Sequence, residues 1–213
     1  KSEVLSHFNA AEYIADYPLT IFFTREGYLK KVPAASLKFT TSDHKLKEGD
    51  EVIVAEETTN KSELVFFSNK CNAYKLRTYD VADGKVAEMG HYVPSLLGLD
   101  ADEKITYAVV TKDYSGYMLF TFANGKMAKV ELKNYETKTN RKKLINAYSA
   151  KSPIVDITFM PEDKDIVIIT ENNRVLTINT KLIPLKTTKS TQGVQVLRQP
   201  KNGVSPAKVE FAE

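Results

Sequence analysis

Cysteine, tryptophan and histidine are scarce in this sequence of 213 residues, which has one cysteine, no tryptophan and three histidines. The lone Cys71 excludes an internal disulfide and any metal site built on several cysteines, and it fits a reducing compartment. His7, His44 and His91 are far apart in the sequence and share no ligand spacing. We therefore expect no zinc site.

Long apolar runs and strong net charge are also missing. No apolar stretch approaches the roughly 20 residues that a membrane-spanning helix needs. The first ten residues do not combine a basic start with an apolar region, as a signal peptide does. We therefore expect a cytoplasmic protein with no membrane partner. The formal net charge of +3 is too small to indicate nucleic-acid binding by itself, so the placement of the basic residues matters more than their total.

Signatures of catalysis and of cofactor binding are absent too. The chain has no glycine-rich phosphate-binding loop. Its acidic stretches 100–103 and 162–165 lack the glycine and the spaced ligands of an EF-hand loop, and turn chemistry accounts for their aspartates. We predict no metal, no other cofactor and no enzymatic activity.

The sequence does contain an internal repeat. Each copy has an apolar run, a polar turn and an alternating run with basic residues, and the four copies are Leu19–Leu37, Glu63–Val81, Tyr117–Tyr135 and Asp165–Ile183. Their equivalent turn positions, Gly27, Cys71, Gly125 and Asn173, are 44, 54 and 48 residues apart. A period of this size is typical of propeller blades. Cys71 is interpreted as a substituted turn residue, not as a nucleophile.

Each repeat predicts a β-hairpin, because a short apolar run rich in β-branched and aromatic residues precedes a turn that tolerates positive φ. Further strands are expected at Glu51–Glu56, Lys104–Thr111 and Pro153–Met160, which gives about four strands per blade. We predict one all-β domain, 1–213, with four propeller-like blades. The alternating stretches Val194–Arg198 and Ala207–Phe211 could close the ring, and the sequence leaves open whether they complete a fifth blade.

The hairpins resemble a known family. Thr24–Val32 (TREGYLKKV) is similar to T-x-x-G-Y-[IL]-K-R, and Asn69–Leu76 (NKCNAYKL) is similar to N-K-G-x-x-Y-K-[LV] with cysteine in place of glycine. Phe122–Val130 (FANGKMAKV) and Ser190–Val194 (STQGV) match two further patterns. These motifs occur in the C-terminal domain of the A subunits of bacterial DNA gyrase and topoisomerase IV, which are type IIA topoisomerases.

The resemblance implies a β-pinwheel, in which neighbouring blades exchange strands, and a domain that bends double-stranded DNA along a basic rim. It implies two further partners, which are the ATPase B subunit and the rest of the A subunit. It also implies a nucleoid-associated location. The family's catalytic tyrosine follows an arginine, and no Arg-Tyr pair occurs here. Lys38–Gly49 lacks the glycine-rich basic box of gyrase, which favours the topoisomerase IV type.

Basic residues recur at comparable places in the alternating halves of the hairpins and in the loops between them. Side chains two apart on a strand share a face, so a ring of blades could align these charges into one curved track. The predicted DNA-binding residues are Lys30, Lys31, Lys75, Arg77, Lys126, Lys129, Lys133, Arg141, Lys142, Lys143, Arg174, Lys186, Lys189 and Arg198. Two alternatives stay open: solvated strand faces that guard against aggregation, and a propeller that binds protein partners through its flat face.

Overall fold

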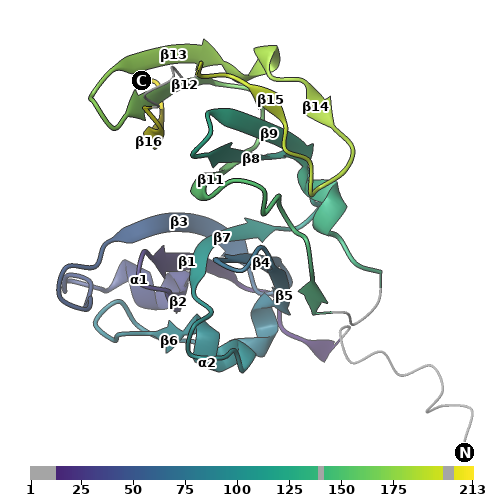
Figure 1. Cartoon of the computed structure of the whole chain (residues 1–213). Helices are drawn as coiled ribbons and strands as arrows, with labels where there is room; N and C mark the ends of the chain where they lie inside the picture. The colour runs from purple at the N-terminus through teal and green to yellow at the C-terminus, as the bar shows by residue number, and fades with distance from the viewer. Residues whose placement is uncertain (1–12, 139–141, 199–203) are drawn as a thin grey trace, which may run out of the picture.

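A computed structural model describes residues 13–138, 142–198 and 204–213. Its strands form four separate sheets, one for each sequence repeat, arranged around a common centre (Figure 1). We number the four sheets as blades 1 to 4 in the order of their repeats in the chain. Blades 1 and 2 lie in the lower half of Figure 1, and blades 3 and 4 lie in the upper half. The prediction of an all-β chain with four propeller-like blades is confirmed.

The blades share one plan, a hairpin with an inner strand on one side. Blade 1 contains β1 (Pro18–Thr24), β2 (Tyr28–Pro33), β3 (Val52–Thr59) and β6 (His91–Tyr92). Blade 2 contains β4 (Glu63–Ser68), β5 (Ala73–Arg77), β7 (Ile105–Thr111) and β10 (Lys143–Leu144). Blade 3 contains β8 (Tyr117–Phe122), β9 (Lys126–Glu131), β11 (Ile154–Met160), β14 (Leu185–Lys186) and β15 (Val194–Gln195). Blade 4 contains β12 (Asp165–Thr170), β13 (Val175–Asn179) and β16 (Pro206–Phe211).

The outer strands come from the neighbouring repeat. β6 follows the hairpin of blade 2 in the chain but pairs with β2 of blade 1. In the same way β10 follows the hairpin of blade 3 and pairs with β5 of blade 2, while β14 and β15 follow the hairpin of blade 4 and pair with β9 of blade 3. We call the segment that leaves a hairpin and carries an outer strand to the preceding blade a crossover. Each crossover therefore connects one blade to the blade before it. In the described part of the chain, β13 of blade 4 has no outer strand.

All four aligned turn positions have positive φ, as the hairpin prediction requires. The angles are 97° at Gly27, 59° at Cys71, 83° at Gly125 and 63° at Asn173. Glycine adopts this conformation without strain, whereas a residue with a Cβ does so at a cost. The same positions bind the crossovers: the carbonyl oxygens of Gly27, Cys71 and Gly125 accept hydrogen bonds from the crossover segments at 2.8–3.0 Å.

The apolar core lies between the blades. One cluster joins blades 1 and 2, with Phe23 and Phe66 in contact. A second joins blades 2 and 3, where the rings of Phe67 and Phe120 meet edge to face at 5.7 Å. A third, smaller cluster joins blades 3 and 4. The hairpin strands β4 and β8 of the two middle blades each face two neighbouring blades, and every residue of these strands after the first is buried.

The inner strands β3, β7, β11 and β16 line a central cavity of about 580 Å³. The terminal strands contribute to existing blades, since β16 pairs with β12 and β15 pairs with β9. No fifth blade is present among the described residues. Short elements that the sequence did not predict are α1 (Ala34–Lys38), α2 (Val93–Leu97), η2 (Thr78–Asp80), η3 (Leu132–Tyr135) and η4 (Thr180–Leu182). Where the chain is described, it holds no helix long and apolar enough to cross a membrane.

Gly193 should be far less replaceable than Gly49, although both have positive φ (72° and 78°). A Cβ on Gly193 would lie 1.9 Å from the carbonyl oxygen of Met127, whereas a Cβ on Gly49 would meet nothing within 4 Å. We predict that Gly193→Ala lowers the free energy of unfolding by at least about 1 kcal/mol more than Gly49→Ala, because only the first adds a steric clash to the shared backbone strain. Urea unfolding of both variants measures the difference. Equal losses would contradict the close packing of the crossover against β9.

Candidate nucleic-acid interface

Three of the predicted DNA-binding lysines occupy the same position in successive blades. Lys31 pairs with Ile21, Lys75 with Val65 and Lys129 with Leu119 in the hairpin registers. Lys31 and Lys129 are only 2% and 4% exposed, and the side chain of Lys75 is 12% exposed. These three side chains are therefore largely withdrawn from solvent.

Each of these lysines holds the crossover that leaves the next blade. The Lys31 Nζ donates to the carbonyl oxygen of Val81 at 2.9 Å, just after η2. The Lys75 Nζ donates to the carbonyl of Thr137 at 3.0 Å, after η3, and the Lys129 Nζ donates to the carbonyl of Thr180 at 2.9 Å, at the start of η4. We call this repeated contact the lysine clamp.

An oxygen from the side chain of a nearby residue completes each clamp. Asn60 Oδ1 accepts from Lys31 at 2.6 Å. Asp163 Oδ1 lies 2.9 Å from the Lys129 Nζ, and Glu63 Oε2 lies 3.7 Å from the Lys75 Nζ. Burial opposes the ionised form of Asp163, but hydrogen bonds from Lys129 and Thr180 outweigh it and hold its pKa below the ordinary value. A buried ammonium group needs such partners, because an unpaired one is very costly.

Lys30 is also internal, with 1% exposure. Its Nζ donates to the carbonyls of Lys45 at 2.7 Å and Val86 at 2.9 Å, and it lies 3.1 Å from Nδ1 of His44. Burial lowers the pKa of Lys30. This side chain joins β2 to two loops and is not directed to solvent.

Blade 2 carries exposed cations at its outer edge. Lys142 and Lys143 are exposed at β10, the outermost strand of this sheet, and Arg77 is exposed at the end of β5. Arg77 donates to the hydroxyl of Tyr79 at 2.7 Å, and the Lys143 Nζ lies 5.9 Å from the centre of the Tyr74 ring. Arg141, which the sequence grouped with these residues, lies outside the described residues.

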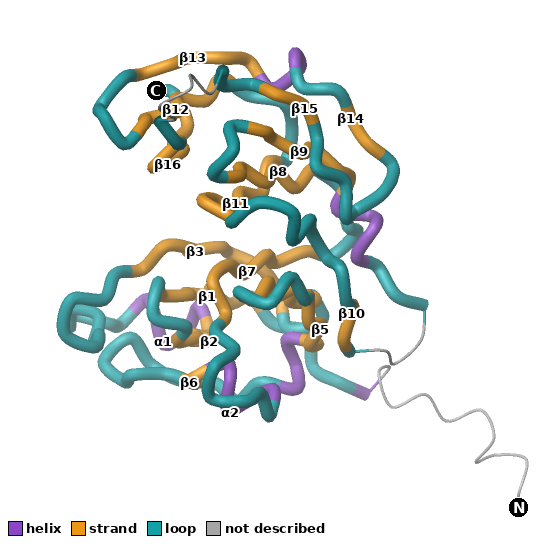
Figure 2. Tube along the Cα trace, viewed as in Figure 1, coloured by secondary structure: helices purple, strands orange, loops and turns teal. Residues whose placement is uncertain are grey.

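Blade 3 presents cations on its crossover segment. Lys186 lies on β14, Lys189 lies in the loop that follows, and both are half-buried, whereas Arg198 is exposed. Lys126 of β9 is half-buried, and its Nζ lies 3.4 Å from the side-chain oxygen of Gln192. In Figure 2 the outer strands β10 and β14 lie along the same margin of the molecule.

The two remaining predicted cations are Lys133, which has an acidic partner, and Arg174, which lies on blade 4. Lys133 is exposed and forms an ion pair with Glu136 at 3.0 Å. Arg174 is exposed at the turn of blade 4 beside β13. The predicted set thus divides into an internal group (Lys30, Lys31, Lys75 and Lys129) and an outer group, the rim cations (Arg77, Lys126, Lys133, Lys142, Lys143, Arg174, Lys186, Lys189 and Arg198).

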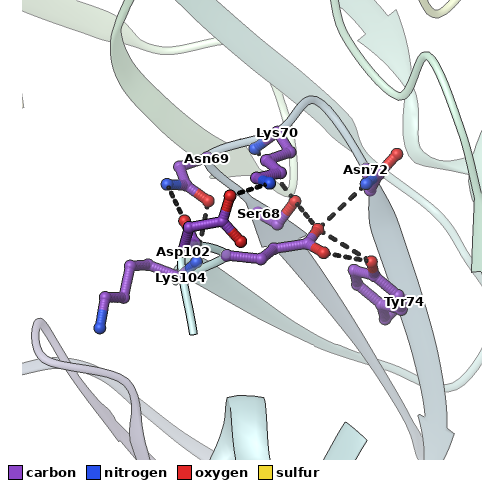
Figure 3. Close-up of polar contacts among 8 residues, drawn as sticks. Ser68, Asn69, Lys70, Asn72, Tyr74, Asp102 and Lys104 are labelled. Carbon is purple, nitrogen blue, oxygen red and sulfur yellow. Dashed lines mark hydrogen bonds and ion pairs between the residues drawn. The ribbon is translucent and has the colours of Figure 1, made fainter. Parts of the chain in front are cut away.

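A buried carboxylate, Glu103, lies between the loop before β7 and the hairpin of blade 2. The sequence pattern indicated only an acidic turn at this position. Glu103 is 7% exposed and accepts hydrogen bonds from Ser68 at 2.6 Å, Asn72 at 3.0 Å and Tyr74 at 2.8 Å (Figure 3). Beside it Lys70 pairs with Asp102. The loop before β7 is therefore tied to the turn of the β4–β5 hairpin. The signal in the sequence was weak, since a carboxylate among other acidic residues ordinarily indicates a solvated turn.

The pKa values in this network follow from the same contacts. Burial opposes ionisation of Glu103, but the three hydrogen bonds outweigh it, and the pKa of Glu103 is held below its ordinary value. Burial and the Glu103 carboxylate together raise the pKa of Tyr74 to about 12. Glu103 is therefore ionised and Tyr74 is protonated at neutral pH.

The fold and its strand exchange define a β-pinwheel, and comparison with known proteins agrees. The structure superposes on the crystal structure of the C-terminal domain of DNA topoisomerase IV with a TM-score of 0.79 and 22% identity, over 94% of this chain and 62% of that one. It also matches the E. coli ParC C-terminal domain, with a TM-score of 0.65 and 14% identity, over 92% of this chain and 79% of that one. No protein-family model matches the sequence.

The sequence is similar to the A subunit of DNA gyrase from Borreliella burgdorferi, with 23% identity over 83% of this chain and 23% of that protein. It is similar to the A subunit of DNA topoisomerase 4 from Bacillus subtilis, with 27% identity over 64% of this chain and 17% of that protein. The chain thus spans about a fifth of the length of these relatives. The predicted resemblance to the C-terminal domains of gyrase and topoisomerase IV A subunits is confirmed.

Removing the ammonium group of Lys129 should destabilise the fold strongly. Lys129→Met keeps an unbranched side chain but removes the cation that pairs with Asp163 and one of the hydrogen bonds to the Thr180 carbonyl, so we predict a loss of about 3–5 kcal/mol in the free energy of unfolding. Lys133→Met removes an exposed cation and should cost no more than about 1 kcal/mol. Chemical denaturation of both variants makes the comparison. Similar small losses would show that the clamp contributes little.

Acidification should remove the stabilisation from Glu103. Because folding lowers the pKa of this group, its contribution is present at pH values above the pKa in the unfolded chain and is lost as the pH falls through the lower, folded value. We predict that the stability difference between the native protein and Glu103→Gln is largest near neutral pH and narrows below about pH 4. Urea unfolding across that range measures it. A difference that stays constant would contradict an ionised Glu103 in the network.

Proposed function

We propose that this domain binds duplex DNA without sequence specificity along the outer edges of blades 2 and 3 and bends it. The observation that carries the proposal is the placement of the rim cations. Lys142, Lys143 and Lys186 lie on or beside the outermost strands of two adjacent blades, along one margin of the molecule (Figure 2). The similarity to gyrase and topoisomerase IV A subunits supports DNA as the partner.

The chemistry of these side chains suits backbone contact more than base reading. Lysine presents a compact charge that attracts phosphate without the bidentate geometry by which arginine reads guanine. Each neutralised phosphate releases condensed counterions, which changes the slope of log K against log salt by about −0.9. Bending a site of 20–30 bp by 40–90° costs on the order of 1–6 kcal/mol, so contacts at separate points along the arc must offset it.

Within a type IIA topoisomerase the bent duplex would be the segment that is transported. We propose that this domain is non-catalytic and that its partners are the ATPase B subunit and the rest of the A subunit. The breakage of DNA then belongs to other parts of the enzyme. The absence of the gyrase-type basic box at Lys38–Gly49 supports a topoisomerase IV type of activity.

Charge reversal on the rim tests the binding surface. We predict that Lys142→Glu with Lys143→Glu weakens binding to a fluorescent duplex by at least about tenfold at low salt, because two phosphate contacts become repulsive. The matched control is Lys45→Glu with Lys47→Glu, which reverses two exposed cations in the loop before β3 of blade 1. Fluorescence anisotropy titrations give the affinities.

Equal weakening by the two double variants would place the DNA on another surface. A native protein that leaves duplex DNA unbound in dilute buffer would contradict the proposed function altogether and would favour the protein-binding propeller. Energy transfer between dyes at the two duplex ends separates bending from simple binding.

A further inference from the structure

Lys30 and His44 meet where the loop between α1 and β3 (residues 39–51), which we call the α1–β3 loop, contacts the β1–β2 hairpin. The Lys30 Nζ lies 3.1 Å from Nδ1 of His44. Lys30 is 1% exposed, and His44 is half-buried. Tyr74 and Ala128 occupy the register position of Lys30 in blades 2 and 3, so this contact is not part of the repeated pattern.

The surroundings of Lys30 determine the protonation state of His44. The Lys30 Nζ has three neighbours that can accept a hydrogen bond: Nδ1 of His44 at 3.1 Å, and the carbonyl oxygens of Lys45 at 2.7 Å and Val86 at 2.9 Å. A neutral amine has two N–H groups, whereas an ammonium group has three and can satisfy all of these neighbours. Because an ammonium group has no lone pair, Nδ1 must be the acceptor. The imidazole is therefore neutral, with its proton on Nε2.

The same atoms hold the α1–β3 loop against the crossover that carries β6. The N–H of Lys45 donates to the carbonyl oxygen of Val86 at 3.0 Å, and that oxygen also accepts from Lys30. We propose that His44 is a pH-sensitive latch, which keeps the loop docked while its imidazole is neutral and releases the loop when it gains a proton. A proton on Nδ1 replaces the hydrogen bond with two positive charges 3.1 Å apart.

The electrostatics around His44 set the direction of this response. Burial lowers the pKa of His44 below the ordinary 6.5, and the charge of Lys30 lowers it further, whereas Asp43 acts in the opposite direction. Asp50 favours the charged form of Lys30, against the effect of burial. Because the docked loop has the lower pKa, docking is favoured above the ordinary histidine value and is weakened as the pH falls through the lowered one.

The other elements at this site contribute an uncharged ring and a set of mixed charges. Phe22 of β1 contacts the imidazole edge to face, with the ring centres 4.5 Å apart. Lys30 also borders a hollow on the side of the crossover. The other titratable groups that line this hollow are Lys31, Asp83, Lys85, Glu88 and His91. His91 is thus the alternative proton sensor, and the test has to separate the two histidines.

Hydrogen exchange at single amides tests the latch in the native protein. Rates are measured by NMR from about pH 7.5 to about pH 4.5, and each is normalised to the rate of an unstructured amide at the same pH to give a protection factor. We expect the protection of the Lys45 amide to fall at least about threefold as His44 titrates, because the latch opens. The Gly84 amide, which donates to the carbonyl of Lys31 at 2.7 Å, should keep its protection, because the crossover stays in place.

The ring nitrogens of His44 give a second readout that needs no variant. Their chemical shifts should show the Nε2–H tautomer at neutral pH. The titration of the ring should have the same midpoint as the loss of protection at Lys45, and this midpoint should lie below the ordinary histidine value of 6.5.

Two asparagine variants separate the histidines. His44→Asn places an amide oxygen close to the position of Nδ1 but takes up no proton in this range, so the protection of the Lys45 amide should no longer fall on acidification. The matched control is His91→Asn, which removes the neighbouring histidine and should leave the fall and its midpoint unchanged.

Four results would overturn the inference. The first is protection at Lys45 that stays constant while His44 titrates, and the second is an Nδ1–H tautomer at neutral pH. The third is a fall that persists in His44→Asn, and the fourth is a fall that His91→Asn abolishes. If His44→Asn does not fold, the tautomer and the shared midpoint decide the question in the native protein. These measurements contain no DNA, so the proposed function can fail while this inference holds.

Discussion

The lysine clamp is the interaction on which the arrangement of the blades depends. A propeller blade cannot bury both of its faces alone, so the fold requires a fixed relation between neighbours. Apolar packing between blades is non-directional and sets their approach, not their register. Lys31, Lys75 and Lys129 add direction, because each ammonium group donates a hydrogen bond to a carbonyl of the crossover from the next blade. The crossovers then carry the outer strands to their partners, and the rim cations Lys143 and Lys186 lie on two of those strands.

The sequence predicted the hairpins of the blades well for a local reason. A hairpin is a local structure, and its signals (an apolar run, a residue with positive φ and an alternating run) lie within about 20 residues of each other. The strands expected at Lys104–Thr111 and Pro153–Met160 appear at Ile105–Thr111 and Ile154–Met160. The outer strands β6, β10 and β14 were not predicted, because two residues have no periodicity and their partners are distant in the chain. β15 lies within the predicted alternating stretch Val194–Arg198, but it pairs with β9 of blade 3.

The candidate site was harder to predict for a different reason. Alternation in a strand shows which side chains share a face, but it does not show whether another segment covers that face. Lys31 and Lys143 look alike in the sequence, yet a crossover covers the first, and the second lies on the covering strand itself. Lysine recurs at one register position in blades 1, 2 and 3, and this recurrence suggested a charged track. In the structure the three residues at that position, Lys31, Lys75 and Lys129, form the lysine clamp. Their role as DNA contacts stays a prediction that the proposed interface does not need.

We propose that the recurrent lysines hold the blades together while the rim cations contact DNA. Mass spectrometry after brief amine labelling of the folded protein, with and without duplex DNA, tests both halves at once. We expect Lys31 and Lys129 to stay unlabelled in both conditions. We expect Lys142, Lys143 and Lys186 to be labelled in the free protein and protected by DNA. Rapid labelling of Lys31 and Lys129 in the folded protein, or rim lysines that DNA leaves equally reactive, would contradict this proposal.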